Sequence, residues 1–347
     1  MIMRRLLFAT LLLAFAGCGG HNSDYVEYEA MEPQPIELES VKLENQLLYC
    51  DDIYVHDNKL VILNTKNKNA LFSLYSLPDM NYLGECGIVG RGPNEFEFIN
   101  TRCTRSGATG FVVGGAVQYD VVDFEIGVDK LSLKKSFTMK YPSTYSSVNA
   151  LVDLPNKFVV YAANEENTEF YLHNKADGRA VPISSYPTEM LGVNASSMAC
   201  SSIFLNRLLL APSNNRFAAV YGQLPMVRIF SSSGEYQSTS LLKAWQEQRF
   251  DVNGDTVTTS DSFQYYLAAC ANDNYVCGLY LGKRPADMQG VDMADVRMEI
   301  HVWNWAGELV ATYLPDRLVN YIALAEDNTL YAVSLLDDRN LYKYKLK

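Results

Sequence analysis

This sequence of 347 residues has few of the residue types that build metal sites and nucleic-acid surfaces. It contains four histidines and no run of basic residues. Its 29 Lys and Arg are outnumbered by 40 Asp and Glu, which gives a net charge of −11. A protein that binds nucleic-acid phosphates needs a cationic surface. We therefore expect no nucleic acid as a partner, and we expect no metal or other cofactor.

Sequence motifs of several enzyme classes are also missing. The chain has no Gly-x-Ser-x-Gly nucleophile motif and no Cys-x-x-Cys pair. A serine hydrolase and a zinc site of that type are therefore not indicated. His21 lies near the N-terminus. His56, His173 and His301 fall on predicted strands of different repeats, which do not direct all three side chains to one ion. We expect no catalytic residues and no metal ligands.

An apolar stretch near the N-terminus has the length of a signal sequence. It follows Arg4 and Arg5 and covers about ten residues from Leu6, too short to span a bilayer. The segment Ala14-Phe15-Ala16-Gly17-Cys18 resembles a bacterial lipobox, with Phe15 where Leu is usual. We predict a lipoprotein signal peptide over residues 1–17, lipidation of Cys18 and a flexible tether over 18–35. The alternative is an ordinary cleaved signal peptide followed by a chance cysteine.

The residues after Cys18 bear on which way such a lipoprotein faces. They are Gly19-Gly20-His21-Asn22, without the acidic cluster that some surface-exported lipoproteins carry. We expect an outer-membrane lipoprotein that contacts the membrane through lipidated Cys18, facing the periplasm rather than the cell surface. Export also permits disulfides. Cys270 and Cys277 flank one predicted turn, so they form either a cross-strand bridge or a pair of buried small apolar residues.

A short hairpin unit recurs about every 47 to 59 residues along the chain. Each copy has an apolar run, a polar turn, a second apolar run and an aromatic third segment. The turns contain Asp57-Asn58-Lys59, Ser106-Gly107-Ala108, Pro155-Asn156-Lys157, Ser213-Asn214-Asn215, Asn272-Asp273-Asn274 and Glu326-Asp327-Asn328. An all-β repeat of this length is typical of a propeller. We predict a six-bladed β-propeller of four-stranded antiparallel blades over residues 36–347, with five or seven blades as the alternative.

The first and last repeats predict how the ring closes. The first contains four strand patterns, 52–56, 60–63, 70–75 and 81–85, whereas the last offers three, 321–325, 330–335 and 341–346. A blade without its fourth strand leaves an open edge. Ile36–Leu43 alternates apolar and polar residues ahead of the first blade. We predict that this segment supplies the missing strand.

Two shorter segments allow more than one interpretation. Ser238–Arg249 has apolar spacing that permits a short helix. Asp251-Val252-Asn253-Gly254-Asp255 resembles the start of a calcium loop, but Thr256 occupies the position of the required Gly and Ser262 that of the Glu. Asn253-Gly254 is also a typical hairpin turn. We predict the turn and retain calcium as the alternative.

A glycine-rich stretch after the first blade carries a family resemblance. Gly87–Phe96 has the sequence GIVGRGPNEF. It resembles the linker of NHL-type repeats and of TolB-like six-bladed propeller lipoproteins of Gram-negative bacteria. The resemblance implies that the chain passes here between blades, with positive φ at the glycines. It also implies that Glu95 caps the turn and that Phe96 fills the gap between blades. Asn94 stands where the family usually has Gly.

The predicted propeller suggests a binding role. Loops between blades and loops that join second to third strands share one face. We expect ligand-binding residues there: Arg91, Asn94, Glu95, Lys68, Glu165, Arg284 and Arg339. The predicted function is a lipid-anchored cell-envelope scaffold whose partner is an envelope protein, a glycan or a peptide. The alternative is an envelope lyase or hydrolase acting on carbohydrate or peptide at the channel mouth.

Overall fold

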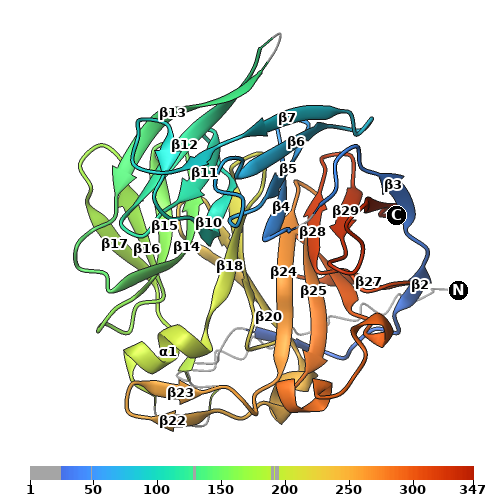
Figure 1. Cartoon of the computed structure of the whole chain (residues 1–347). Helices are drawn as coiled ribbons and strands as arrows, with labels where there is room; N and C mark the ends of the chain where they lie inside the picture. The colour runs from blue at the N-terminus through green and yellow to red at the C-terminus, as the bar shows by residue number, and fades with distance from the viewer. Residues whose placement is uncertain (1–24, 48, 128–129, 189–190, 192–194) are drawn as a thin grey trace, which may run out of the picture.

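The computed structural model describes residues 25–47, 49–127, 130–188, 191 and 195–347. Within these residues, six sheets stand around a common axis, each packed against its neighbours (Figure 1). In every sheet the strand nearest the axis is followed in order by the next three strands of the blade, paired antiparallel. The predicted fold class and number of blades are confirmed. The predicted signal peptide and Cys18 lie outside the described residues.

The blades follow one another along the chain, and each is given from its inner to its outer strand. The first blade consists of β4 (Asp52–His56), β5 (Lys59–Leu63), β6 (Phe72–Ser76) and β7 (Tyr82–Cys86). The second consists of β10 (Asn100–Ser106), β11 (Phe111–Gly114), β12 (Gln118–Ile126) and β13 (Leu131–Lys140). The third consists of β14 (Ser147–Asp153), β15 (Lys157–Ala163), β16 (Phe170–Asn174) and β17 (Ala180–Ser184). The fourth blade consists of β18 (Asn206–Leu210), β19 (Arg216–Tyr221), β20 (Met226–Ser231) and β21 (Tyr236–Leu242). The fifth consists of β24 (Gln264–Ala271), β25 (Tyr275–Lys283), β26 (Glu299–Asn304) and β27 (Leu309–Pro315). The sixth consists of β28 (Tyr321–Leu324), β29 (Thr329–Val333), β30 (Asn340–Lys345) and β3 (Glu39–Lys42).

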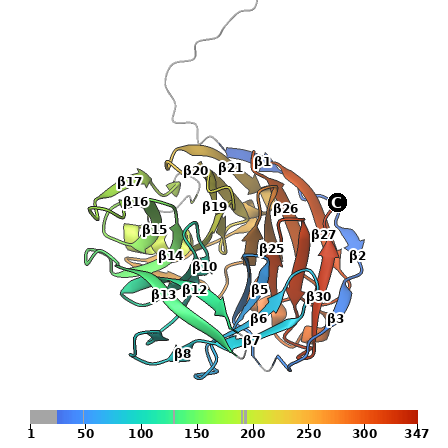
Figure 2. The ribbon, with the colours of Figure 1, turned by 90° about the horizontal axis from the view of Figure 1, so that it is seen from above.

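The N-terminal segment runs along the outer edges of three blades (Figure 2). β1 (Tyr25–Tyr28) pairs in parallel with β21, β2 (Gln34–Ile36) pairs in parallel with β27, and β3 pairs antiparallel with β30. We call residues 25–43 the strap. The prediction that the segment Ile36–Leu43 supplies the last strand of the ring is confirmed for Glu39–Lys42, whereas Ile36 ends β2 on the fifth blade. The structure differs from the predicted tether over 18–35, because residues 25–28 and 34–36 are strands that satisfy the exposed edges of two blades.

Apolar side chains fill the spaces between blades. Phe72 of the first blade packs edge-on against Phe111 of the second, with ring centroids 5.8 Å apart. Phe96 lies in the same cluster and is 3% exposed, so it fills the interblade gap as the family resemblance implied. Another cluster joins the last blade to the first through Tyr331 and Ile53. The ring therefore closes on a continuous apolar packing surface.

Several segments lie outside the blades and cover one face of the ring, at the lower side of Figure 1. The α-helix α1 (Ser197–Ile203) has Ser196 as its N-cap, whose Oγ accepts a hydrogen bond from the Ala199 amide at 3.2 Å. A two-stranded hairpin, β22 (Asp251–Asn253) and β23 (Thr256–Thr258), lies beside it. Short 3-10 helices cover residues 243–247, 285–288 and 293–295.

Two predictions for these segments have different outcomes. The hairpin turn at Asn253-Gly254 is confirmed, and Gly254 has a φ of +60°. The predicted helix over Ser238–Arg249 is wrong for its first half, which belongs to strand β21, and the remainder contains only a 3-10 helix. Residues 238–242 are strand because they pair with both β20 and β1, an arrangement that apolar spacing does not reveal. The sequence reading also missed α1.

The glycine-rich loop contains the short parallel pair β8 (Ile88–Val89) and β9 (Glu95–Phe96). Its glycines have two different roles. Gly87 has a φ of +82°, whereas Gly90, Gly92 and Asn94 are not among the residues with positive φ. A Cβ on Gly90 would lie 2.1 Å from Glu95 Oε2, the atom that accepts a hydrogen bond from the Gly92 amide at 2.7 Å. Glu95 therefore caps this turn as implied, but Gly90 and Gly92 serve to let its carboxylate approach the backbone.

This distinction predicts different effects of alanine at the two kinds of glycine. Gly87→Ala combines a strained backbone with a Cβ 2.8 Å from the buried ring of Phe72, so we expect a loss of about 1–3 kcal/mol in the free energy of unfolding. Gly90→Ala displaces the flexible end of Glu95 and loses one hydrogen bond, about 1 kcal/mol. Urea denaturation of both variants measures the difference. An equal or larger loss in Gly90→Ala would contradict the assignment.

Candidate functional site

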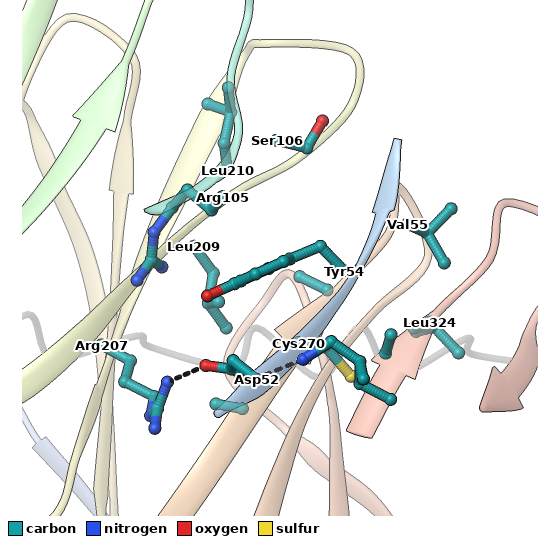
Figure 3. Close-up of a pocket in the computed structure, with 14 residues that line it drawn as sticks. Asp52, Tyr54, Val55, Arg105, Ser106, Arg207, Leu209, Leu210, Cys270 and Leu324 are labelled. Carbon is teal, nitrogen blue, oxygen red and sulfur yellow. Dashed lines mark hydrogen bonds and ion pairs between the residues drawn. The ribbon is translucent and has the colours of Figure 1, made fainter. Parts of the chain in front are cut away.

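The inner strands of the blades surround a central channel that contains a cavity of about 70 Å³. Its lining comes from β4, β10, β18, β24 and β28. Most of the lining is apolar, and the charged side chains are Asp52, Arg105 and Arg207. Figure 3 shows Arg105 and Arg207 directed toward Tyr54 and Asp52. A largely apolar cavity with a few convergent polar groups is the usual form of a ligand site.

Asp52 and Arg207 form a buried ion pair across the channel. Arg207 Nη1 lies 2.7 Å from Asp52 Oδ2, and Asp52 is 4% exposed. Arg207 Nη2 donates to the Leu267 carbonyl at 3.1 Å, and Asp52 Oδ1 accepts the Ile53 amide at 3.0 Å. Burial alone would lower the pKa of Arg207, but the Asp52 carboxylate outweighs it and raises that pKa. Arg207 therefore stays charged, and these contacts fix the pair in place.

Arg105 is the less satisfied cation of the channel. It is 7% exposed, and its Nη2 donates to the Arg102 carbonyl. Its Nε has no hydrogen-bond partner, and no carboxylate lies within ion-pair distance of it, among the described residues. Burial lowers the pKa of Arg105, and the neighbouring Arg207 lowers it further. The cavity lining thus holds two guanidinium groups and one carboxylate, a positive site within an acidic protein.

The channel cavity adjoins an opening of about 250 Å³ on one face of the ring. We call this the turn face, because the turns between the first and second strands of the blades line it; the opposite side is the loop face. His56 and Glu326 lie at the opening, and His56 Nδ1 is 2.9 Å from Ser106 Oγ. Burial lowers the pKa of His56. The opening and the channel cavity share the lining residues Val55, Ser106, Leu210, Ala271 and Leu324.

Four of the predicted ligand-binding residues lie together near the glycine-rich loop. Arg91 and Glu95 line a groove of about 700 Å³ at the edge of the first two blades. Asn94 Oδ1 accepts the Lys135 amide at 3.4 Å, and Lys135 Nζ donates to the Glu95 carbonyl at 2.7 Å. Lys68 joins this region through its backbone, because its carbonyl accepts the Val89 amide at 2.8 Å.

The other predicted residues lie on different blades. Glu165 is exposed in the third blade, Arg284 pairs with Asp287 at 3.1 Å in the fifth, and Arg339 is exposed in the sixth. The sequence reading missed the channel residues. Asp52 begins the inner strand that the pattern 52–56 predicts, but its burial and its role in the channel were not anticipated. The available signal was a charged residue, Asp52, Arg105 or Arg207, within the innermost strand of a repeat.

The other reactive side chains occupy separate positions. His173 pairs with Tyr145 at 2.6 Å and His301 with Tyr266 at 3.1 Å, each within its own blade. No group of three or more His, Cys, Asp or Glu in the described part of the chain is arranged to hold a metal ion. Cys270 and Cys277 face each other across one hairpin as free, buried thiols, which favours the second of the two alternatives considered for them.

A search of the described residues for a membrane-spanning helix identifies none of sufficient length and apolarity.

Comparison with known proteins identifies the family. The sequence model of the family described as TolB-like 6-blade propeller-like matches residues 36–327. The chain belongs to the TolB-like propeller family. Its fold is similar to that of a DUF4221 family member from Bacteroides vulgatus, with a TM-score of 0.55, 7% identity and coverage of 91% of this chain and 98% of the other. The β-propeller domain of Cps50 (Swd1) from Myceliophteria thermophila gives a TM-score of 0.43, 8% identity and coverage of 89% and 100%. No curated protein matches the sequence.

Arg91 of this TolB-like propeller is expected to contribute little to stability. Its side chain is 83% exposed, and its ion pair with Glu97 at 2.6 Å is also solvated. Such surface pairs contribute roughly 0–1 kcal/mol. We expect Arg91→Ala to leave the melting temperature nearly unchanged, as measured by circular dichroism. A large decrease would show that Arg91 supports the fold and would remove it as a candidate ligand-binding residue.

Proposed function

We propose that this TolB-like propeller is a lipid-anchored scaffold of the cell envelope that binds a ligand or partner protein at its central channel. The observation that carries the proposal is the buried charge of the channel. Arg105, Arg207 and Asp52 come from three different blades and meet at one cavity below an open mouth. Inner strands held in a closed ring fix such side chains without further ordering on binding, which favours affinity.

The membrane anchor in this proposal rests on the sequence around Cys18. The proposed location is the outer membrane, with the propeller facing the periplasm, and the signal segment and the residues after Cys18 support it. The strap begins at Tyr25 on the edge of the fourth blade. Seven residue steps separate it from Cys18, and an extended chain covers at most about 25 Å in that number of steps. A lipidated Cys18 would thus hold the ring close to the membrane surface.

We expect Cys18→Ala to release the protein from the membrane without altering its fold. The lipid on Cys18 would be the attachment, and the described residues of the propeller begin only after it. Fractionation of cells, followed by a carbonate wash of the membranes, measures the first effect, and circular dichroism of the released protein measures the second. Retention of Cys18→Ala in the washed membranes would contradict the anchor.

Site-specific photo-crosslinking in native envelopes tests the scaffold and the face that it uses. A crosslinking residue in place of Glu326 reports on the opening at the turn face. The matched position is Arg91, in the groove by the glycine-rich loop. We expect a defined adduct from position 326 and none from position 91. An adduct from position 91 alone would move the binding surface to that groove, and no adduct from either would contradict the scaffold.

A further inference from the structure

We propose that the channel cavity is a binding site for a carboxylate group, with the Arg105 guanidinium as its anchor. This inference rests on the proposed function, because it assigns a ligand chemistry to the same channel. The ligand is a molecule that ends in a carboxylate, either a small free carboxylate or the C-terminus of a peptide.

The first argument is the unbalanced charge of Arg105. A buried cation normally has an anionic partner, because an unpaired charge in a protein interior is costly. Only 7% of the surface of Arg105 is exposed, and its Nε has no hydrogen-bond partner among the described residues. Asp52 is not the anionic partner of Arg105, because its two carboxylate oxygens accept hydrogen bonds from Arg207 and from the Ile53 amide. A bound anion would supply the missing partner.

The second argument is that the backbone of β10 is irregular where it presents this side chain. The register of β10 against β11 shifts between Asn100 and Arg105. Irregularities of this kind change the direction of a side chain and occur often next to functional sites. Arg105 lines the channel cavity, and Figure 3 shows its side chain near the hydroxyl of Tyr54. The fold therefore directs a cation into the channel instead of hiding it between blades.

The third argument is size and access. The cavity of about 70 Å³ has room for a carboxylate group, because a cavity of about 10–15 Å³ by the same measure already holds one water molecule. The wider opening at the turn face leads to it. Guanidinium matches the planar geometry of a carboxylate, which favours this anion. Asp57 and Glu326 at the opening would favour a positive charge on the ligand behind its carboxylate.

Isothermal titration calorimetry of the intact chain at constant ionic strength tests the assignment. The probes are sodium acetate, the tripeptide Ala-Lys-Ala with a free C-terminus, and the same tripeptide with an amidated C-terminus. We expect saturable binding of at least one free carboxylate and none of the amide. Arg105→Gln should weaken that binding at least tenfold. The matched control Arg179→Gln, which changes an exposed arginine in the turn between β16 and β17, should leave it unchanged.

A second measurement separates binding from a structural role. A binding arginine without a counter-charge destabilises the free protein, so Arg105→Gln should melt at the same or a higher temperature without ligand. It should also lose the increase in melting temperature that the binding probe gives the unmodified protein. Binding of acetate alone would identify a small-carboxylate site, and binding of the peptide alone a C-terminus site.

Binding of none of the probes, or equal binding to the Arg105→Gln variant, would overturn the carboxylate assignment. The scaffold proposal has its own test in the adduct from position 326, which does not depend on Arg105. A positive adduct with no carboxylate binding would therefore reject this inference and leave the scaffold in place. Carboxylate binding without any adduct would support the carboxylate site and reject the scaffold.

Discussion

Removal of the strap, residues 25–43, is expected to destabilise the whole ring rather than one end of it. Ile36, Leu38 and Leu43 are each less than 8% exposed, and they pack into the fifth, sixth and first blades. Full burial of such a side chain contributes about 1.5–3 kcal/mol, so the three side chains together contribute roughly 5–9 kcal/mol. That is comparable with the whole stability of many domains, about 5–15 kcal/mol. The deletion also exposes the outer edge of the sixth blade.

Urea denaturation compares chains that begin at residue 25 and at residue 44. We expect a single transition at much lower urea for the shorter chain, or no folded protein. Leu38→Ala and Leu43→Ala in the intact chain provide a milder version, each with a loss of about 2–5 kcal/mol. Ser40→Ala, at an exposed position of β3 between these two leucines, is the matched control. Equal stability of the two chains would show that the ring closes without the strap.

The second large effect is expected at a buried ion pair between the third and fourth blades. Glu169 has no exposed surface, and its carboxylate accepts hydrogen bonds from Arg228 and Tyr221 and one from Ser184 at 3.3 Å. Arg228→Met leaves this carboxylate without its cation. The loss of one partner of a buried pair costs about 3–5 kcal/mol, and we expect that decrease in the free energy of unfolding.

The destabilisation caused by Arg228→Met should depend on pH, and the pKa of Glu169 determines the direction of that dependence. Burial raises the pKa of Glu169 even beside Arg228, and the pKa should rise further in the variant. A carboxyl group whose pKa is higher in the folded state than in the unfolded state stabilises the fold in acid. It loses that contribution as the pH rises through the raised pKa. The destabilisation of Arg228→Met relative to the unmodified protein should therefore grow from about pH 5 to pH 8.

The double variant Glu169→Gln with Arg228→Met removes both charges and serves as the control. Its stability relative to the unmodified protein should vary much less over the same pH range, because it has no buried carboxyl group to titrate. Melting temperatures of the three proteins at several pH values provide the measurement. A pH-independent difference for Arg228→Met would show that solvent reaches Glu169 once the arginine is gone.

The sequence alone was sufficient for the repeat and the ring. Asn58, Asn214 and Asn328 mark three of the turns, and all three adopt positive φ in the structure. Asn tolerates this conformation better than most residues, so its place in the repeat is a local signal. The alternation of apolar and polar residues in Ile36–Leu43 is a local signal as well. It predicted the closing strand because the side chains of a strand alternate between two faces.

Only the tertiary structure showed the contacts between distant parts of the chain. Asp52 and Arg207 are 155 positions apart, and neither neighbourhood predicts that they meet. β1 and β2 lie on blades four and five because those blades have open outer edges, and an open edge is a property of the assembled sheet. Gly90 is glycine because the Glu95 carboxylate folds back onto it. Local patterns determine turns and strand faces, whereas the partner of a buried charge or a free edge depends on which blades the closed ring brings together.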